Sequence, residues 1–308
     1  SGLNPSYGLN RSTGAKTRGF MDKIIAGRKR DLGGFIVERA LPTVEKRAVG
    51  PFVFLDHMGP LTIDERHKLD VRPHPHIGLA TVTYLFEGCG MHRDTLGSKQ
   101  LIQPGDMNWM TAGRGIAHSE RTPAEALTAG GRLHGVQIWV GLPSAEEECE
   151  PAFTHWPHSQ LPFARRDKDV SVRVMLGEFE GTRSPVPTLS PMLFLDVDTK
   201  TSAELRFQET EVAVFLVAGA GAVNGQAVNP SDLAVLGDPS RVRLEGQARW
   251  VVIGGEPFPE KRHMWWNFVS SRPERIRRAA EEWRAGRFGS IDGETEFIPL
   301  PDSPPFPT

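Results

Sequence analysis

The sequence predicts an all-β protein built from two similar domains. Three features support this fold class: short apolar or alternating runs, frequent turn residues and an internal repeat. The chain has 308 residues, of which 32 are glycine and 25 proline, so short strands joined by turns are favoured over long helices. This length exceeds the range in which one hydrophobic core usually keeps growing, which favours two domains.

Strands are predicted from residue 52 onward, where short apolar or alternating runs lie between glycines and prolines. In the first half, these runs are at 81–86, 101–110 and 135–142. A polar, acidic stretch at 143–151 interrupts the pattern. In the second half, the runs are at 171–176, 191–198, 212–219 and 248–255. The pattern therefore gives two strand-rich zones, one on each side of the acidic stretch.

One helix is predicted near the end of the chain, at about 271–285. Ser271 and Glu274 have the spacing of a capping box, and Gly286 provides a stop signal. Its apolar residues fall on one face at helical spacing: Ile276, Ala279, Ala280 and Trp283. We expect this face to pack on the second domain.

An internal repeat indicates that the all-β domain is duplicated. The run YLFEG at 84–88 is followed by QLIQPGD at 100–106, and FLVAG at 215–219 is followed by QAVNPSD at 226–232. Each copy has an aromatic-Leu-x-x-Gly step, then a glutamine, a proline four residues later and an aspartate two residues after that. Two ordered matches within strand-like sequence are stronger than a single match.

These features divide the chain into three parts. Residues 1–20 are polar and rich in glycine, serine and asparagine, so we expect a flexible leader, with Met21 as a candidate native start. Residues 21–150 form the first predicted domain. Residues 151–308 form the second, which ends in the helix.

Composition excludes several classes of function. The formal net charge is −2, so there is no basic footprint for nucleic acid. No apolar run approaches the roughly 20 residues of a membrane-spanning helix. The only cysteines, Cys89 and Cys149, do not suggest a disulfide framework, and a reducing cytoplasm is the expected location.

The strongest chemical signal is a pair of short motifs, RPHPHIG at 72–78 and GRGIAHSE at 113–120. Residues two apart in a strand point to the same face, so His74 projects with His76 and His118 projects with Glu120. If both segments face one barrel interior, four metal-ligating groups converge there. Pro75 lacks a backbone donor, which suggests an edge strand or a bulge at this point.

This donor set predicts one bound metal ion. Imidazole and carboxylate suit Fe, Mn, Co, Ni, Cu or Zn, while the lack of cysteine argues against a structural zinc. Four ligands leave one or two open positions on a five- or six-coordinate ion. Single histidines are usually structural or surface residues, but two pairs with strand spacing favour a metal over coincidence.

The repeat provides an internal control for this prediction. His74 and His76 precede Gly88 by 14 and 12 residues, and the same counts before Gly219 give Leu205 and Phe207. His118 and Glu120 follow Asp106 by 12 and 14 residues. The same counts after Asp232 give Leu244 and Gly246. No ligand is repeated, so we expect a packed second interior and one metal per chain.

Three runs resemble the pirin family of the cupin superfamily: PHPHIGLATVTYLFEG, PGDMNWMTAGRGIAHSE and HGVQIWVGLP. The resemblance covers roughly residues 24–290, including GRFG at 286–289. It implies a bicupin of two antiparallel, jelly-roll-like barrels, with a mononuclear metal, usually iron as Fe(II), in the first. It carries over four residues as ligands: His74, His76, His118 and Glu120.

The resemblance also implies alternative functions. Family members are associated with quercetin 2,3-dioxygenase-like activity on an aromatic, flavonol-like substrate with O2, and others with regulation through a protein partner. Many cupins and several pirins have a glutamate shortly after the His-x-His pair, where this chain has Ala80. Any activity that depends on that acid is therefore in question.

Other polar residues are expected to be structural. Asp56 and His57 are assigned a turn-stabilising role rather than ligation. His92 and His134 could reach the barrel mouth or the surroundings of the ligands, but neither has a histidine or glutamate two residues away, so structural or exposed roles are favoured. Gln137 could hydrogen-bond within the barrel, although its face is not determined by the sequence.

The leading functional interpretation is a quercetinase-type dioxygenase. Vicinal oxygens of the substrate would ligate the metal, and Glu120 would accept the substrate hydroxyl proton. The alternatives are a metal-containing regulator that binds another protein, and a metal enzyme with different chemistry, such as a cupin isomerase or another oxygenase. The same four ligands are compatible with all three.

Overall fold

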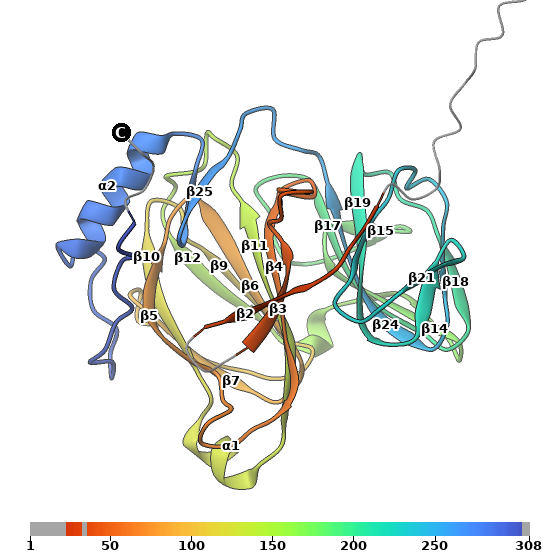
Figure 1. The fold of residues 1–308 in the computed structure, drawn as a ribbon, viewed down its shortest axis with the longest axis horizontal. Coiled ribbons are helices and arrows are strands. Elements are labelled where there is room, and N and C mark those ends of the chain that lie inside the picture. Colours follow the sequence, from red (N-terminus) through yellow and green to blue (C-terminus); the bar gives the residue numbers. More distant parts are fainter. Residues whose placement is uncertain (1–22, 33–35, 304–308) are drawn as a thin grey trace, which may run out of the picture.

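The computed structural model describes residues 23–32 and 36–303. They form two antiparallel β-barrels side by side, with a helix on the outer side of the first barrel (Figure 1). The predicted all-β bicupin class with a C-terminal helix is confirmed. The expected leader at 1–20 and Met21 lie outside the described residues.

The first barrel is made of two sheets. The larger sheet has the order β12 (Ala152–Trp156), β9 (Met107–Thr111), β6 (Leu79–Glu87), β11 (Arg132–Gly141), β4 (Phe52–Thr62), β3 (Ile36–Leu41) and β2 (Arg28–Asp31). The smaller sheet has the order β5 (Asp70–His76), β10 (Ile116–Arg121), β7 (Gly90–Asp94) and β8 (Lys99–Ile102). The short helix α1 (Ala124–Ala129) connects β10 to β11.

The second barrel repeats this plan. Its larger sheet has the order β1 (Lys23–Ile25), β22 (Leu233–Val235), β19 (Glu211–Gly219), β24 (Ala248–Gly255), β17 (Met192–Thr199), β14 (Val170–Leu176) and β13 (Phe163–Arg166). Its smaller sheet has the order β18 (Ser202–Leu205), β23 (Val242–Glu245), β20 (Gly221–Val223) and β21 (Gln226–Val228). Two hairpins and one turn of 3-10 helix complete the elements: β15 (Glu178–Phe179) with β16 (Thr182–Arg183), β25 (His263–Trp265) with β26 (Phe268–Ser270), and His158–Gln160.

One edge strand of each large sheet comes from a part of the sequence next to the other barrel. β1 precedes the first barrel but pairs with β22 of the second, and β12 follows the first barrel but pairs with β9 of that barrel. β12 and β1 therefore occupy equivalent edges. This pairing ties the two strand-rich zones together at both ends of the first barrel's sequence.

The two repeat turns have the same hydrogen bond. In the first, the backbone N–H of Gln103 donates to the carboxylate of Asp106 at 3.2 Å; in the second, Asn229 donates to Asp232 at 3.0 Å. The first turn breaks the expected strand at 101–110 into β8 and β9. The duplicated motif thus corresponds to a duplicated local structure.

The larger sheets of the two barrels pack face to face. Val82 and Ile138 of the first barrel belong to the same buried apolar cluster as Phe194 and Phe215 of the second. Tyr84 crosses this layer, and its hydroxyl donates to the Asp196 carboxylate at 2.5 Å. One face of each large sheet is therefore used for this contact, and the other faces the interior of its own barrel.

The two interiors differ in polarity. The inward residues of β6 alternate as Leu79, Thr81, Thr83 and Leu85, and the two leucines belong to separate apolar clusters. A polar section therefore lies between two apolar sections in the first barrel. The interior of the second barrel is one apolar cluster, which includes Leu205, Phe207 and Leu244.

The C-terminal helix α2 (Pro273–Arg284) packs on the first barrel, so its expected position on the second domain is wrong (Figure 1). Its buried residue Ile276 packs with Ile77 and Phe268. The Arg275 guanidinium donates to the Arg114 carbonyl at 2.6 Å. No described helix has the length and apolar composition that crossing a membrane requires.

The expected capping box is also wrong. The helix begins after Arg272 and has no side-chain cap. Ser271 instead uses its backbone N–H and its hydroxyl to donate to the two carboxylate oxygens of Glu147, at 2.6 and 2.9 Å. Ser271 therefore binds Glu147, in the acidic stretch at 143–151, instead of capping the helix.

Asp56 and His57 lie inside strand β4 rather than in a turn, which corrects the role assigned to them. Asp56 accepts two hydrogen bonds from Arg39. His57 lies between the barrels, with Nδ1 2.8 Å from the Ser231 hydroxyl and Nε2 2.8 Å from Nε2 of His134. Burial lowers the pKa of His57 to about 3 and that of His134 to about 4.

The His57–His134 contact predicts acid sensitivity. The unfolded chain protonates these histidines below about pH 6.5, while the folded chain keeps them neutral until about pH 4 to 3, so stability is lost as pH falls through this window. At pH 5 the expected loss is about 2 kcal/mol per histidine. The difference in unfolding free energy between wild type and His57→Gln should therefore shrink from pH 7 to pH 5, as measured by urea denaturation.

Val44, with 87% of its surface exposed, provides the control for this experiment. Val44→Gln should keep the wild-type pH dependence, because neither side chain ionises. A constant difference between wild type and His57→Gln from pH 7 to pH 5 would contradict the interpretation.

The packed second interior predicts a large cost for a charge. Leu205→Asp or Phe207→Asp should lower the free energy of unfolding by more than about 3 kcal/mol, because each buries a carboxylate among apolar side chains. Thermal and urea denaturation measure the effect. Leu189→Asp, at a position with 45% of its surface exposed, should change little. An unchanged melting temperature for Leu205→Asp would mean that this position does not face the core.

Candidate metal centre

The expected ligands lie on two adjacent strands of the small sheet in the first barrel. His74 and His76 are on β5, which forms the edge of this sheet, and His118 and Glu120 are on β10. His118 pairs directly with His74, and the register shifts between His118 and Glu120. β5 is therefore an edge strand, one of the two alternatives expected from Pro75. The register shift lies near this proline, where the partners of β10 change from His74 to Val71.

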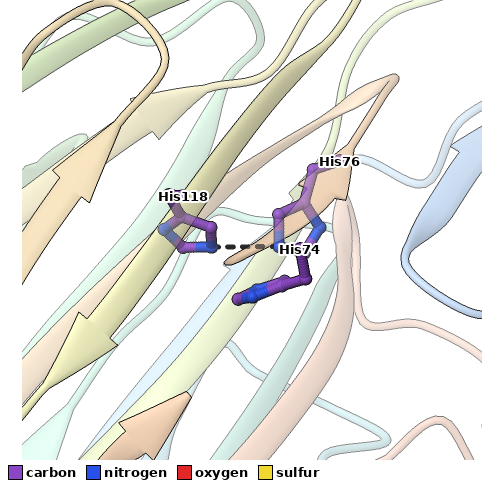
Figure 2. A group of neighbouring side chains, drawn as sticks. All are labelled: His74, His76 and His118. Atoms are coloured by element: carbon purple, nitrogen blue, oxygen red, sulfur yellow. Dashed lines mark hydrogen bonds between the residues drawn. The ribbon is translucent and has the colours of Figure 1, made fainter. Parts of the chain in front are cut away.

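The three histidine rings converge in the barrel interior (Figure 2). His76 Nε2 and His118 Nε2 are 3.1 Å apart, and the centroid of the His74 ring is 4.4 Å from that of His118. One potential ligand atom from each ring lies within 4.8 Å of the others. Each residue has at most 7% of its surface exposed, so the cluster is buried.

Backbone carbonyls fix the orientation of the two β5 rings. His74 Nδ1 lies 2.8 Å from the Arg72 carbonyl, and His76 Nδ1 lies 3.1 Å from the Asn267 carbonyl in the β25–β26 turn. A carbonyl oxygen can only accept, so in both neutral rings the proton is on Nδ1. The Nε2 lone pairs therefore face the cluster, as a metal ligand requires.

With one proton on each ring, the row of histidines leaves one contact without a proton. His92 Nε2 donates to the Asp94 carboxylate at 2.8 Å, so its Nδ1, 3.4 Å from His118 Nδ1, has a lone pair. His118 has one proton but faces lone pairs on both sides, at His76 Nε2 and His92 Nδ1. Whichever side receives the proton, two lone pairs meet on the other.

One added cation would complete this row, and a metal ion held by His76 and His118 is a candidate for it. The Nε2 atoms of His76 and His118, 3.1 Å apart, would both hold the ion, and the His74 ring lies beside them. The His118 proton would then be on Nδ1, directed at His92. The donor set and its geometry therefore fit a transition metal.

Burial keeps these imidazoles available as ligands at neutral pH. It lowers the pKa of His74 to about 4 and places the pKa values of His76 and His118 well below their usual range. A neutral imidazole with a free lone pair binds a cation without first losing a proton.

Glu120 faces the same interior, where the Thr83 hydroxyl donates to its Oε1. Burial raises the pKa of this carboxyl, and the hydrogen bond from Thr83 opposes the rise only in part. A buried carboxylate of this kind gains from a nearby cation or from a proton. The potential ligand atoms form two groups that share His118: His74 and His76 belong to the first, and His92 and Glu120 belong to the second.

His92 is buried, not exposed, and it reaches the surroundings of the expected ligands, which the sequence had left open. His92 is buried on β7, directly across from Glu120, and forms a group of metal-ligating type with His118 and Glu120. The signal was present in the sequence, because His92 and Asp94 have the same two-residue spacing as the recognised pairs. By contrast, His134 is structural, as expected.

Ala80 faces away from the candidate metal centre. It packs with Val82 and Tyr84 in the cluster between the barrels, while Thr83 on the same strand points inward to Glu120. A glutamate at position 80 would therefore project into the apolar contact between the barrels. The absence of an acid here does not alter the four-donor set.

Two more polar side chains lie along the polar section. Gln137 Oε1 is 3.1 Å from the Thr83 hydroxyl oxygen, so this residue faces the barrel interior. Asn108 pairs with Thr83 across strands β9 and β6, and its buried Nδ2 lacks a hydrogen-bond partner among the described residues. A buried donor of this kind requires an explanation, such as a water molecule or a ligand.

Comparisons with known proteins agree with this architecture. The sequence matches the Pirin family over residues 34–140 and the Pirin C-terminal cupin domain over 194–289. A pirin-like protein of Caulobacter vibrioides is 43% identical over 92% of this chain and all of its own length. A crystal structure of quercetin 2,3-dioxygenase from Acinetobacter baumannii is 35% identical, with a TM-score of 0.85 over 92% of this chain and 95% of that one.

A more distant structure is that of a bacterial pirin of Escherichia coli in complex with nickel(II). It is 19% identical to this chain, with a TM-score of 0.60 over 76% of this chain and 99% of that one. At this identity the likeness establishes a shared fold. The nickel belongs to that protein.

The geometry predicts one metal ion per chain. Elemental analysis should find about one equivalent of transition metal, which is lost in His76→Ala or His118→Ala because each removes a ligand. His67→Ala, at an exposed position, should retain the metal. Two equivalents per wild-type chain would contradict the interpretation, because the second interior is apolar.

Proposed function

The chain belongs to the pirin family, and we propose that it is a metal-dependent dioxygenase of the quercetin 2,3-dioxygenase type. The observation that carries this proposal is the convergence of His74, His76 and His118 in a polar section of the first barrel, where Glu120 forms a neighbouring group with His118. The 35% identity with the quercetin 2,3-dioxygenase of Acinetobacter baumannii supports the choice of substrate class.

The proposed ligands are the three histidines and Glu120. Fe(II) is the expected ion, and Zn, Mn, Ni, Co and Cu are compatible with the same donors. When bound, the metal supplies Lewis acidity that makes a ligated substrate hydroxyl more acidic. The substrate is a flavonol-like aromatic with vicinal oxygens, and O2 is the second substrate.

Glu120 is proposed to accept the substrate hydroxyl proton. Burial raises the pKa of this carboxyl, which makes its ionised form a stronger base. The Thr83 hydroxyl donates to Oε1 and so fixes the orientation of the carboxylate. This bond holds the acceptor in place beside the ligand histidines.

Asn108 is proposed to position the substrate. Its Nδ2 is a buried donor, and its cross-strand partner Thr83 contacts Glu120. A substrate oxygen near Glu120 would provide the acceptor that this donor lacks. The same site would exclude bulk water, because its side chains are nearly fully buried.

Anaerobic metal reconstitution followed by oxygen-uptake assays tests the proposal. The reconstituted protein should consume oxygen with one or more members of a panel of flavonols and catechols. No uptake with any of them would refute the dioxygenase assignment. Metal-dependent binding of a protein partner in that same sample would favour a regulator instead.

Glu120→Gln should impair turnover far more than metal retention. The amide oxygen still ligates weakly beside three histidines, but the amide cannot accept the substrate proton, which typically costs about 10²–10⁴-fold in rate. Oxygen uptake and elemental analysis on the same preparation separate the two effects. Glu125→Gln, on the exposed surface of α1, is the matched control and should behave as wild type. Full metal with full turnover in Glu120→Gln would remove this residue from the reaction.

A further inference from the structure

His92 and Asp94 form a buried pair on the strand next to the proposed ligand His118. Both lie on β7, which pairs with β10, so that Asp94 is opposite His118 and His92 is opposite Glu120. His92 and Asp94 are each at most 2% exposed, and the His92 ring stacks on Phe153 with centroids 4.2 Å apart. The pair is therefore held in one position by the strand register and by packing.

The carboxylate of Asp94 determines which nitrogen of His92 is protonated. Asp94 Oδ1 accepts the backbone N–H groups of Leu96 and Ser98, at 2.9 and 3.0 Å. Oδ2 accepts the Nε2 proton of His92 at 2.8 Å. A singly protonated His92 ring therefore has its proton on Nε2 and presents the Nδ1 lone pair to Nδ1 of His118.

We propose that Asp94 and His92 are positioning residues that hold His118 with its proton on Nδ1 and its Nε2 lone pair directed at the metal. This inference rests on the proposed metal site but not on the dioxygenase reaction. The chain of contacts runs from the Asp94 carboxylate through His92 to His118 and then to the ion. Partners of this kind orient a ligating histidine and raise its basicity.

This arrangement distinguishes His118 from the other two histidines. His74 and His76 donate to neutral backbone carbonyls, whereas His118 is connected through one imidazole to a carboxylate. A carboxylate polarises the hydrogen bonds that connect it to His118 more strongly than a backbone carbonyl would. His118 should therefore be the strongest electron donor among the three.

Direct ligation by His92 fits the geometry less well. His92 and His118 face each other through their Nδ1 atoms, whereas His118 faces His76 through Nε2. An ion between His76 and His118 is therefore on the far side of the His118 ring from His92. The Nε2 atom of His92 is already bound to Asp94.

The tautomers can be measured on the wild-type protein, so this test needs no substitution. The full chain is labelled with [15N]histidine and loaded with Zn(II), a diamagnetic probe for the same donors. Two-bond 1H–15N correlation spectra identify the protonated and the metal-bound nitrogen of each ring. We expect His118 to be protonated on Nδ1 with Zn(II) on Nε2, and His92 to be protonated on Nε2 with a free Nδ1.

Asp94→Asn tests the role of the carboxylate. The amide oxygen can still accept from Leu96 and Ser98, but the NH2 group now faces His92 Nε2 and moves the His92 proton to Nδ1, toward the Nδ1 proton of His118. Zn(II) affinity, measured by competition with a chelator, should fall by about 10–100-fold. The matched control is Asp106→Asn, because Asp106 is also buried and accepts hydrogen bonds from Gln103 and His158, outside the cluster. This control should bind Zn(II) as wild type does.

Three results would overturn the proposal: a His92 proton on Nδ1 in the wild type, a Zn(II)-bound nitrogen on His92, or wild-type Zn(II) affinity in Asp94→Asn. If Asp94→Asn does not fold, the wild-type tautomers decide alone. None of these measurements uses turnover. A failure of oxygen uptake would therefore refute the dioxygenase and leave the tautomers and affinities to decide the role of Asp94 and His92.

Discussion

Two groups that can only accept hydrogen bonds, the carbonyl of Asn267 and the carboxylate of Asp94, set the chemistry of the first barrel. Each fixes the proton of one imidazole, on His76 and on His92, and both rings then direct lone pairs at His118. With one proton on each ring, the row is one cation short, and a metal ion held by His76 and His118 would supply that cation.

The two barrels show that this chemistry is separable from the fold. They share strand order in both sheets, yet the inward positions have changed character. Counting from the repeat glycines places Val214 where the first barrel has Thr83, and Leu205 where it has His74. The second interior is one apolar cluster, whereas the first keeps a polar section between two apolar clusters. Polar residues in a barrel interior without a structural need for them are best explained by a ligand.

Much of this could be predicted from the sequence, because strand alternation is a local rule. It placed His74 and His118 on inward faces, and the repeat distinguished the two interiors. The remaining features depend on pairing between distant segments. His92 reaches the cluster because β7 pairs with β10, and Ser271 leaves the helix cap because Glu147 from another part of the chain accepts its hydrogen bonds. Local spacing does not contain this information.

The most direct test of the account is an anomalous difference map from a crystal of the metal-loaded protein, recorded at the absorption edge of the bound metal. The account predicts a single peak per chain, within ligating distance of His74, His76, His118 and Glu120, and no peak inside the second barrel. A peak coordinated by His92, a peak in the second barrel, or no peak within the first barrel would contradict it.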